Sequence, residues 1–167
     1  EKEEAMQKLK QIFAECGISF QVVKNVKGAP VQGFIKKEGE KIILTMMINN
    51  SIDTKQAAEM LCQADNILIF CHKNPDGDTL GSGAALMHAL KKLGKTCAVM
   101  CHDEIAPKYD FLGIELFRKQ FVPQFTVAVD VADSKLLGEN TLPYSEIVDL
   151  CIDHHGSNRD YAANLLL

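Results

Sequence analysis

From residue 51 onward, the chain alternates between short apolar runs and segments in which apolar residues recur at helical spacing. Nearly uninterrupted apolar runs are typical of strands that are buried on both faces of a parallel sheet. The expected strands are 66–71, 96–101, 125–129 and 148–152. The expected helices are 54–64, 79–93, 113–120 and 134–137. Strands that alternate with helices predict an α/β fold with an open, doubly wound parallel sheet.

The first fifty residues follow a different pattern, and we expect them to form a small α+β module. Their first apolar residues recur at helical spacing and stop before Gly17: Ala5, Met6, Leu9, Ile12, Phe13 and Cys16. Three strand-like stretches follow, separated by turn-forming residues: Phe20–Val26, Val31–Lys37 and Lys41–Ile48. We expect a helix and a three-stranded meander over residues 1–50, a linker at Asn49-Asn50-Ser51, and a second domain over 51–167. The role of residues 1–50 stays open.

The composition limits the class of protein and its location. No apolar run approaches the roughly 20 residues that a membrane span needs, and the charged residues 1–4 do not resemble a secretory signal, so we expect a cytoplasmic protein. Residues 51–167 hold ten Lys and Arg against sixteen Asp and Glu, which argues against a general nucleic-acid binder. The missing initiator Met and the abrupt end after Asn164 suggest a piece of a longer chain.

Side chains that bind metal ions follow three of the predicted strands, at the point where each strand ends. The three groups are His72-Lys73-Asn74-Pro75-Asp76-Gly77-Asp78, then Asp130 with Asp133 nearby, then Asp153-His154-His155. The carboxyl ends of parallel strands form the crevice in which open α/β sheets bind ligands. We therefore expect the three groups to converge at one edge of the sheet.

The residue types in these groups favour a particular metal chemistry. Imidazole together with several carboxylates suits Mn²⁺ or a similar divalent ion better than an ion that prefers thiolates. Two such ions, about 3.5–4 Å apart, can clamp the attacking and leaving oxygens of a phosphate displacement. Neighbouring histidines do not easily bind the same ion, so one of His154 and His155 would bind metal while the other faces substrate.

Each group also has an ordinary structural explanation. Asp78 could cap a helix that begins at Thr79, Asp130 and Asp133 could be turn residues, and His154-His155 could be a polar loop. Three separate turns or caps that happen to carry such residues at strand ends would be a rare coincidence, and this favours the metal site. The Gly81-Ser82 pair could let the first turn of the following helix approach a phosphate group. His88 lies among apolar residues of an expected helix, and His102 follows a strand with only Asp103 and Glu104 beside it, so we expect structural roles for both.

The run from His72 to Ser82, together with Asp130 and Asp153-His154-His155, resembles the first three motifs of the DHH phosphoesterase superfamily. The run through Gly81-Ser82 is most similar to the branch of bacterial oligoribonucleases that also act as pAp phosphatases. The resemblance covers roughly residues 54–167. It implies that one metal is bound by His72, Asp76 and Asp130, and the other by Asp78, Asp130 and His154. It also implies Mn²⁺ or Mg²⁺ as the cofactor, Asp130 as the bridging ligand, and His155 as a contact to the substrate phosphate.

The resemblance implies an activity and leaves alternatives open. The expected activity is hydrolysis of short oligoribonucleotides or of 3′,5′-bisphosphorylated adenosine, so the partners would be short RNA or a small nucleotide. Hydrolysis of cyclic dinucleotides is the alternative within the superfamily. The family's fourth-motif aspartate and C-terminal substrate domain would lie beyond Leu167, so a catalytically incomplete nucleotide-binding fragment is an alternative of another class. Asp160 is the nearest candidate to replace that aspartate, and a homodimer is compatible with the sequence.

Overall fold

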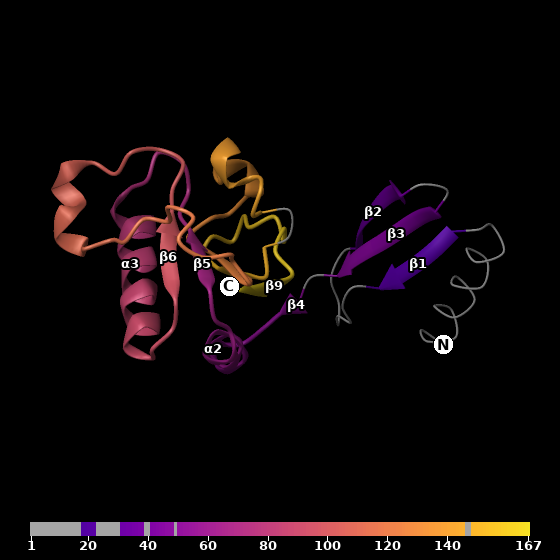
Figure 1. Ribbon diagram of the computed structural model, residues 1–167, viewed down its shortest axis with the longest axis horizontal. Coiled ribbons are helices and arrows are strands. Elements are labelled where there is room, and N and C mark those ends of the chain that lie inside the picture. Colours follow the sequence, from indigo (N-terminus) through magenta and orange to yellow (C-terminus); the bar gives the residue numbers. More distant parts are fainter. Residues whose placement is uncertain (1–17, 23–30, 39–40, 49, 146–147) are drawn as a thin grey trace. The chain divides into compact units, whose positions relative to one another are not determined.

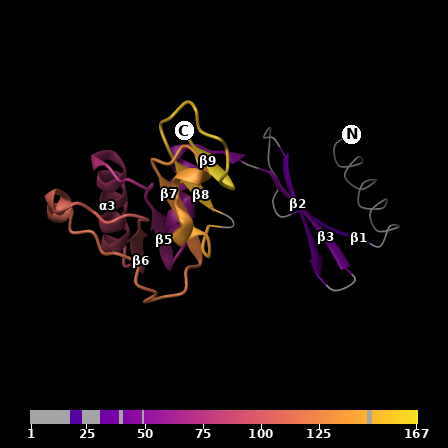
Figure 2. The same ribbon diagram turned by 90° about the horizontal axis from the view of Figure 1, so that it is seen from above.

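The computed structural model describes residues 18–22, 31–38, 41–48, 50–145 and 148–167. The chain divides into two compact units, 1–50 and 51–167, and each is considered by itself. Figures 1 and 2 show the strands and helices of each unit. The helix expected within the first sixteen residues lies outside the described residues.

The first unit contains a three-stranded sheet in the order β1-β3-β2, so the expected meander is wrong. Its strands are β1 (Ile18–Val22), β2 (Val31–Glu38) and β3 (Lys41–Ile48). β2 and β3 form an antiparallel pair, whereas β1 lies parallel to β3. A meander would place β1 next to β2 in antiparallel orientation. Parallel neighbours need a crossover instead of a tight turn, and apolar periodicity carries no information on which strands pair.

The second unit is built on a parallel sheet, which confirms the predicted fold class. The order is β4-β9-β8-β7-β5-β6, and β5 to β9 are all parallel to their neighbours. The strands are β4 (Asn50–Ser51), β5 (Ile67–Phe70), β6 (Cys97–Met100), β7 (Phe125–Val129), β8 (Leu150–Ile152) and β9 (Asn164–Leu166). β9 was not predicted, because its three residues are too few to give a periodic signal.

The strand order reverses between β5 and β7. The chain passes from β5 to β6 on one side of β5 and then returns to β7 on the other side. Connections that diverge at such a switch point leave a crevice beyond the carboxyl ends of the two strands, where ligands bind in open α/β sheets. The loop that begins with His72 follows β5, and Asp130 follows β7. The topology therefore places both segments at the crevice.

Two hydrophobic layers cover the sheet. The helices α2 (Thr54–Gln63) and α3 (Gly77–Lys92) pack on the face that contains Ile67 and Ile69, and Figure 1 shows α3 running alongside β5 and β6. Leu68 and Phe70 point to the opposite face, as expected from the alternation of side chains along a strand. Short 3₁₀ turns cover that second face: η2 (Ser134–Leu136) and η3 (Glu139–Thr141).

Two predicted helices differ from the structure. The helix expected at 134–137 is the short turn η2. The helix expected at 113–120 is wrong: the helical turn in this region is η1 (Pro107–Leu112), and the chain after it runs along the free edge of β6. There the Val99 N–H donates to the Glu115 carbonyl at 2.9 Å, and the Phe117 N–H donates to the Val99 carbonyl at 2.8 Å. Pairing with an open sheet edge satisfies these backbone groups better than an isolated helical turn.

The start of α3 also differs from the prediction. Asp76, not Asp78, is the N-cap, and the helix begins at Gly77. Further along, a Cβ atom added to Gly83 would lie 2.8 Å from Cys71 Sγ, so glycine allows α3 to pack closely against β5. Within the described part of the chain, neither α2 nor α3 is long and apolar enough to cross a membrane.

Candidate metal centre

The loop between β5 and α3 is held in place by hydrogen bonds that also orient its metal-binding groups. Asp76 Oδ1 accepts from the backbone N–H groups of Asp78 at 2.9 Å and Thr79 at 3.2 Å. These bonds lower the pKa of the Asp76 carboxyl, with Thr79 contributing most. The Thr79 hydroxyl is buried, accepts from the His72 N–H at 3.4 Å and donates to the Val129 carbonyl at 3.1 Å. Thr79 therefore ties the loop to the end of β7.

The ring of His72 has a defined orientation. Its Nδ1 lies 2.8 Å from the Lys73 carbonyl oxygen. A carbonyl can only accept, so Nδ1 carries the proton and Nε2 keeps its lone pair. Nε2 lies 3.7 Å from Asp76 Oδ1 and 3.9 Å from Asp130 Oδ2. An imidazole fixed through its other nitrogen is the usual arrangement of a metal-binding histidine.

Asp130 lies at the centre of the site. It follows β7 directly, and its backbone is left-handed, with φ of 57°, an uncommon value for a residue with a side chain. The Asp130 N–H donates to the Ile152 carbonyl at 2.9 Å, which joins the ends of β7 and β8. Its side chain is only 8% exposed. Burial, and secondarily the negative charge of Asp78, raises the pKa of its carboxyl.

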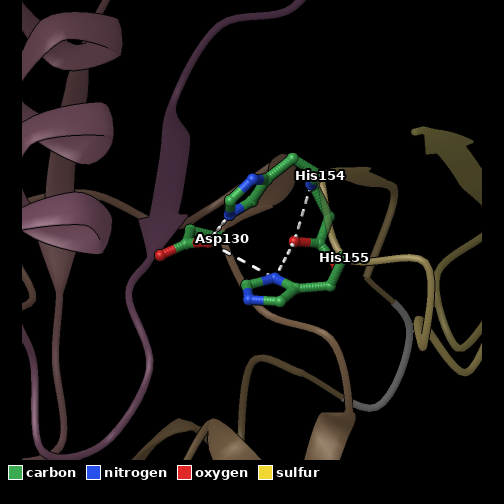
Figure 3. Close-up of side chains that lie close together, drawn as sticks. Asp130, His154 and His155 are labelled. Atoms are coloured by element: carbon green, nitrogen blue, oxygen red, sulfur yellow. Dashed lines mark hydrogen bonds and ion pairs between the residues drawn. The ribbon is translucent and has the colours of Figure 1, made fainter.

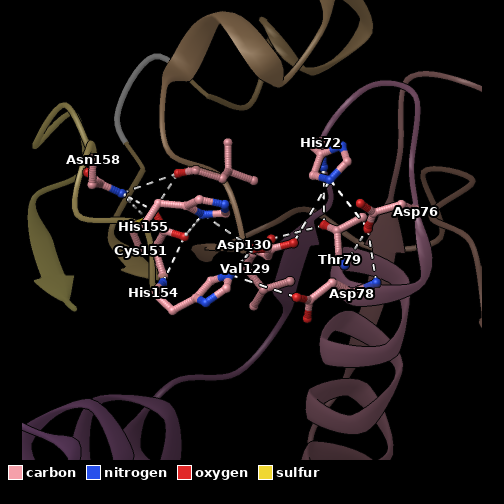
Figure 4. Close-up of polar contacts among 12 residues, drawn as sticks. His72, Asp76, Asp78, Thr79, Val129, Asp130, Cys151, His154, His155 and Asn158 are labelled. Atoms are coloured by element: carbon pink, nitrogen blue, oxygen red, sulfur yellow. Dashed lines mark hydrogen bonds and ion pairs between the residues drawn. The ribbon is translucent and has the colours of Figure 1, made fainter.

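The two oxygens of Asp130 face different groups. Oδ2 faces His72, whereas Oδ1 lies 3.2 Å from His154 Nε2 and 3.5 Å from His155 Nδ1. Figure 3 shows the side chains of both histidines extending toward Asp130. Asp78 Oδ2 lies on the same side as His154, 3.8 Å from its Nε2. Figure 4 shows Asp130 between His72 and Asp76 on one side and the two histidines on the other.

Asp153 orients His155. Its side chain is fully buried, and Oδ1 accepts from His155 Nδ1 at 2.7 Å and from the His154 N–H at 2.9 Å. Oδ2 accepts from the Asn158 side-chain amide at 2.6 Å. Burial acts to raise the pKa of Asp153, but the bonds from Asn158 and His155 outweigh it, so the pKa is lowered. The bond between Asp153 and His155 also raises the pKa of His155. This bond uses Nδ1 of His155, and its Nε2 has no bond to the other described residues.

Two sets of ligand atoms could each hold a cation. His72, Asp76 and Asp130 form one set, and Asp130, Asp153, His154 and His155 form the other, with the atoms of each set within 4.8 Å of one another. Asp130 belongs to both sets. Because both oxygens of Asp153 already accept hydrogen bonds, we assign it to orientation of His155 and not to metal binding.

A buried oxygen atom without a hydrogen-bond partner supports the binding of a cation by these residues. Asp130 Oδ1 is buried and has no hydrogen-bond partner among the described residues. A buried carboxylate oxygen without a donor is costly, and a cation between Asp130 and His154 would supply the missing partner. Carboxylate oxygens with imidazole nitrogens are a donor set suited to Mn²⁺, so the residues present fit a divalent metal.

A pocket of about 410 Å³ opens beside the second set and is lined by Asp78, Ser82, Asp130 and His154, among others. The structure therefore brings Ser82 to the site. Gly81 is not among the lining residues, and a Cβ added there would meet no atom within 4 Å. The remaining candidates lie elsewhere: Asp133 caps η2, and Asp160 belongs to neither set of ligand atoms.

Sequence reasoning missed three residues that hold the site together: Thr79, Asn158 and Asp103, whose Oδ2 accepts from the Asn74 N–H at 2.6 Å. Thr79 and Asn158 lie close to the motifs, but a threonine in a helix and an asparagine in a loop carry no distinctive pattern.

The structural roles expected for two other histidines agree with their bonds. His88 Nε2 lies 2.8 Å from the Leu112 carbonyl, and His102 Nδ1 lies 3.0 Å from Asn140 Oδ1.

A parallel α/β sheet that gathers three histidines and four carboxylates at the carboxyl ends of β5, β7 and β8 defines a domain whose ligand-binding crevice could hold divalent cations. Residues 66–166 match the family model described as DHH family, N-terminal domain. The match covers more than half of the chain, and the protein belongs to the DHH family. Members of this family are metal-dependent phosphoesterase hydrolases.

Proposed function

We propose that the protein hydrolyses phosphate esters of short oligoribonucleotides and of 3′,5′-bisphosphorylated adenosine through a site for two Mn²⁺ ions. The observation that carries this proposal is the position of Asp130. Its two oxygens face two separate groups of donors, and one of them is buried without a hydrogen-bond partner among the described residues. A carboxylate in this position is suited to bridge two cations.

The ligands divide between the two sides of Asp130. His72 and Asp76 would hold the first cation together with Asp130, and Asp78 and His154 would hold the second. When bound, the two cations would activate water and offset the negative charge of the reacting phosphate. Mg²⁺ is the alternative, but imidazole ligands favour Mn²⁺.

The protein's own groups would position the substrate. The His155 ring is fixed by Asp153, and its Nε2 is free to contact a phosphate oxygen. Because the pKa of His155 is raised, the ring holds a second proton to higher pH, and Nε2 can then donate a hydrogen bond. The Ser82 hydroxyl lines the same pocket and is a second donor to phosphate.

The pocket favours a small substrate. Its volume of about 410 Å³ lies in the range of small-ligand sites. Its charged lining residues include Asp78, Asp130 and Asp153 but neither Lys nor Arg, so a phosphate would depend on the cations for attraction. A short substrate with one phosphate at the centre agrees with these features better than a long nucleic acid, which would require a basic surface. We further propose that this activity is cytoplasmic.

The proposal is tested by measuring hydrolysis with Mn²⁺ on four substrates: a linear diadenylate, 3′,5′-bisphosphorylated adenosine, a cyclic diadenylate and bis-p-nitrophenyl phosphate. We expect turnover of the first two in preference to the cyclic compound. Asp130→Asn should abolish turnover, and Asp133→Asn, a change of the same kind three residues away, should not. Preference for the cyclic compound would replace the substrate assignment, and tight Mn²⁺ binding without hydrolysis of any substrate would mean a binding domain.

A further inference from the structure

A second pocket, of about 450 Å³, lies at the carboxyl end of β6, beside Met100, the last residue of that strand. We call it the Arg118 pocket, and its other lining residues are Phe117, Arg118, Lys119, Asn140, Pro143 and Tyr144. Its charged lining residues are both cationic. The pocket at the metal centre and a third pocket near η1 are lined by several carboxylates but neither Lys nor Arg.

The two cations of the Arg118 pocket are available for a ligand. Arg118 and Lys119 are exposed, and neither has a carboxylate partner among the residues that the structure describes. Lys55 and Lys91, by contrast, pair with Glu59 and Glu115. In a unit with an excess of acidic residues, two neighbouring unpaired cations beside a pocket produce a local attraction for anions.

The backbone that carries these two cations has a defined conformation. The Arg118 N–H donates to the Gln120 side-chain carbonyl, and the Gln120 amide donates to the Leu116 carbonyl at 3.4 Å. Lys119 has a left-handed backbone with φ of 62°, a conformation that costs roughly 1 kcal/mol in a residue other than glycine. A lysine therefore occupies a position at which glycine would be less strained, as is common at functional sites.

Two aromatic residues also line the pocket. Phe117 and Tyr144 pack edge to face, with ring centroids 5.4 Å apart, and both are partly exposed. The Asn140 side chain is already engaged by the Cys101 carbonyl and by His102, so it forms a fixed part of the wall. Aromatic side chains next to cations are the combination that binds a base together with its phosphate.

We propose that the Arg118 pocket binds a nucleoside monophosphate, with the base against Tyr144 and Phe117 and the phosphate at Arg118 and Lys119. This binding requires neither metal nor hydrolysis. The ligand can come from two sources: a free mononucleotide, or a second nucleotide of a strand whose reacting phosphate lies at the metal centre. Both pockets lie at the carboxyl edge of the sheet, and β5 separates β6 from β7. Two interstrand spacings amount to about 10 Å, but the metal-centre pocket lies on the α3 side of the sheet and the Arg118 pocket on the other side. A strand that reaches both must therefore cross the carboxyl edge of the sheet.

The first experiment measures AMP binding to the whole chain by calorimetry in EDTA, where the acidic metal centre has no attraction for phosphate. The test variant is Arg118→Ala with Lys119→Gly, because glycine removes the charge without adding strain at a positive φ. The control is Lys55→Ala with Lys92→Ala, which removes the same charge from α2 and α3. We expect the test variant to weaken AMP binding at least tenfold and the control to change it less than twofold.

Two probes then separate the base from the phosphate. Ribose 5-phosphate and adenosine should each bind more weakly than AMP, and Tyr144→Ala should reduce the difference between AMP and ribose 5-phosphate. A thermal melt of each variant shows that it is folded. The proposal is overturned if AMP does not bind in EDTA, if the test variant binds it as tightly as the wild type does, or if ribose 5-phosphate binds as tightly as AMP.

A kinetic experiment separates the two sources of the nucleotide. If the pocket holds a second nucleotide of the substrate, the test variant raises KM for the linear diadenylate at least fivefold and leaves hydrolysis of bis-p-nitrophenyl phosphate unchanged. If the ligand is free AMP, KM for the diadenylate stays the same while AMP binding is lost. Hydrolysis of bis-p-nitrophenyl phosphate reports on the metal centre alone, so a failure of the proposed function is distinguished from a failure of the Arg118 pocket.

Discussion

The two sides of Asp130 differ in how their ligands are held. On one side, His72 and Asp76 come from a single short loop, and each is fixed by a hydrogen bond to backbone. On the other side, His154 and Asp78 come from segments far apart in the sequence. The side chain of His72 is 18% exposed, whereas that of His154 is 69% exposed. His72 is therefore better pre-organised than His154, whereas the carboxylates Asp76 and Asp78 are similarly exposed, at 64% and 62%.

This difference teaches that one central carboxylate can face two sets of candidate ligands that are held to different degrees. Ordering a flexible side chain on binding costs about 0.5–1.5 kcal/mol, and the ligands of the first side have already lost most of that freedom. We therefore expect a tighter cation on the His72 side and a weaker one on the His154 side. The following changes test or sharpen that comparison, in decreasing order of expected effect.

Asp130→Asn should have the largest effect, because it removes the charge that both sides share. We expect loss of both Mn²⁺ equivalents by calorimetry and a fall in turnover of roughly a thousandfold or more. Asp133→Asn is the matched control and should keep both. Retention of either Mn²⁺ equivalent by Asp130→Asn would contradict the bridging role.

The Asp130→Asn variant should also be more stable than the wild type when metal is absent. Since burial raises the pKa of Asp130, the folded protein binds this proton more tightly than the unfolded chain, and stability is lost as the pH rises through the folded pKa. At pH 7 the asparagine avoids that cost, and we expect an increase of about 1 kcal/mol, or about 3 °C in Tm. The melt is measured in EDTA, and the advantage should disappear at a pH below the folded pKa.

Replacement of His72 or His154 by alanine probes each side of Asp130 separately. His72→Ala should weaken the tighter Mn²⁺ equivalent at least tenfold, about 1.4 kcal/mol. His154→Ala should leave that equivalent in place and remove the weaker one. Calorimetric titration of both variants checks the order, and the comparison is wrong if His154→Ala abolishes the tighter equivalent.

His155→Ala should separate metal binding from turnover. Its Nδ1 is engaged by Asp153, so we expect both Mn²⁺ equivalents to persist while kcat falls about a hundredfold. Loss of metal from this variant would instead make His155 a ligand and His154 the substrate contact.

Asn158→Ala should have the smallest effect and acts through Asp153. The variant loses the short bond to the buried Asp153 carboxylate, longer contacts to the Val131 carbonyl and Cys151 Sγ, and the bond that the side-chain oxygen accepts from the Asp160 N–H. We expect a loss of stability of about 1–2 kcal/mol from the Asp153 bond and a fall in turnover of less than tenfold. Because the pKa of Asp153 is lowered, its stabilising contribution is present above the unfolded pKa and is lost as the pH falls through the folded pKa. The stability difference between wild type and variant should therefore shrink at low pH, and a difference that does not depend on pH would contradict this role.

Deletion of residues 1–49 serves as a control for the whole comparison. None of the proposed ligands lies there, and the unit that begins at residue 51 contains all of them. Mn²⁺ affinity of the folded deletion variant should remain within tenfold of the full chain.

The sequence by itself determined the fold class and the segments that form the metal centre. Strands buried on both faces must be almost entirely apolar, so the polar residues that follow them, such as His72 and Asp130, mark the strand ends without any tertiary information. In a parallel sheet those ends share one edge, and the candidate ligands could be named for that reason.

Only the tertiary structure decided which groups touch. The order β1-β3-β2 and the strand β9 depend on pairing between segments, which hydrophobic periodicity does not encode. The start of α3 depended on competition between Asp76 and Asp78 for the same backbone N–H groups, which only the built loop resolves. Asp153 orients a histidine because Asn158 occupies its other oxygen. Hydrogen bonds and burial join residues through space, and a one-dimensional pattern records neither.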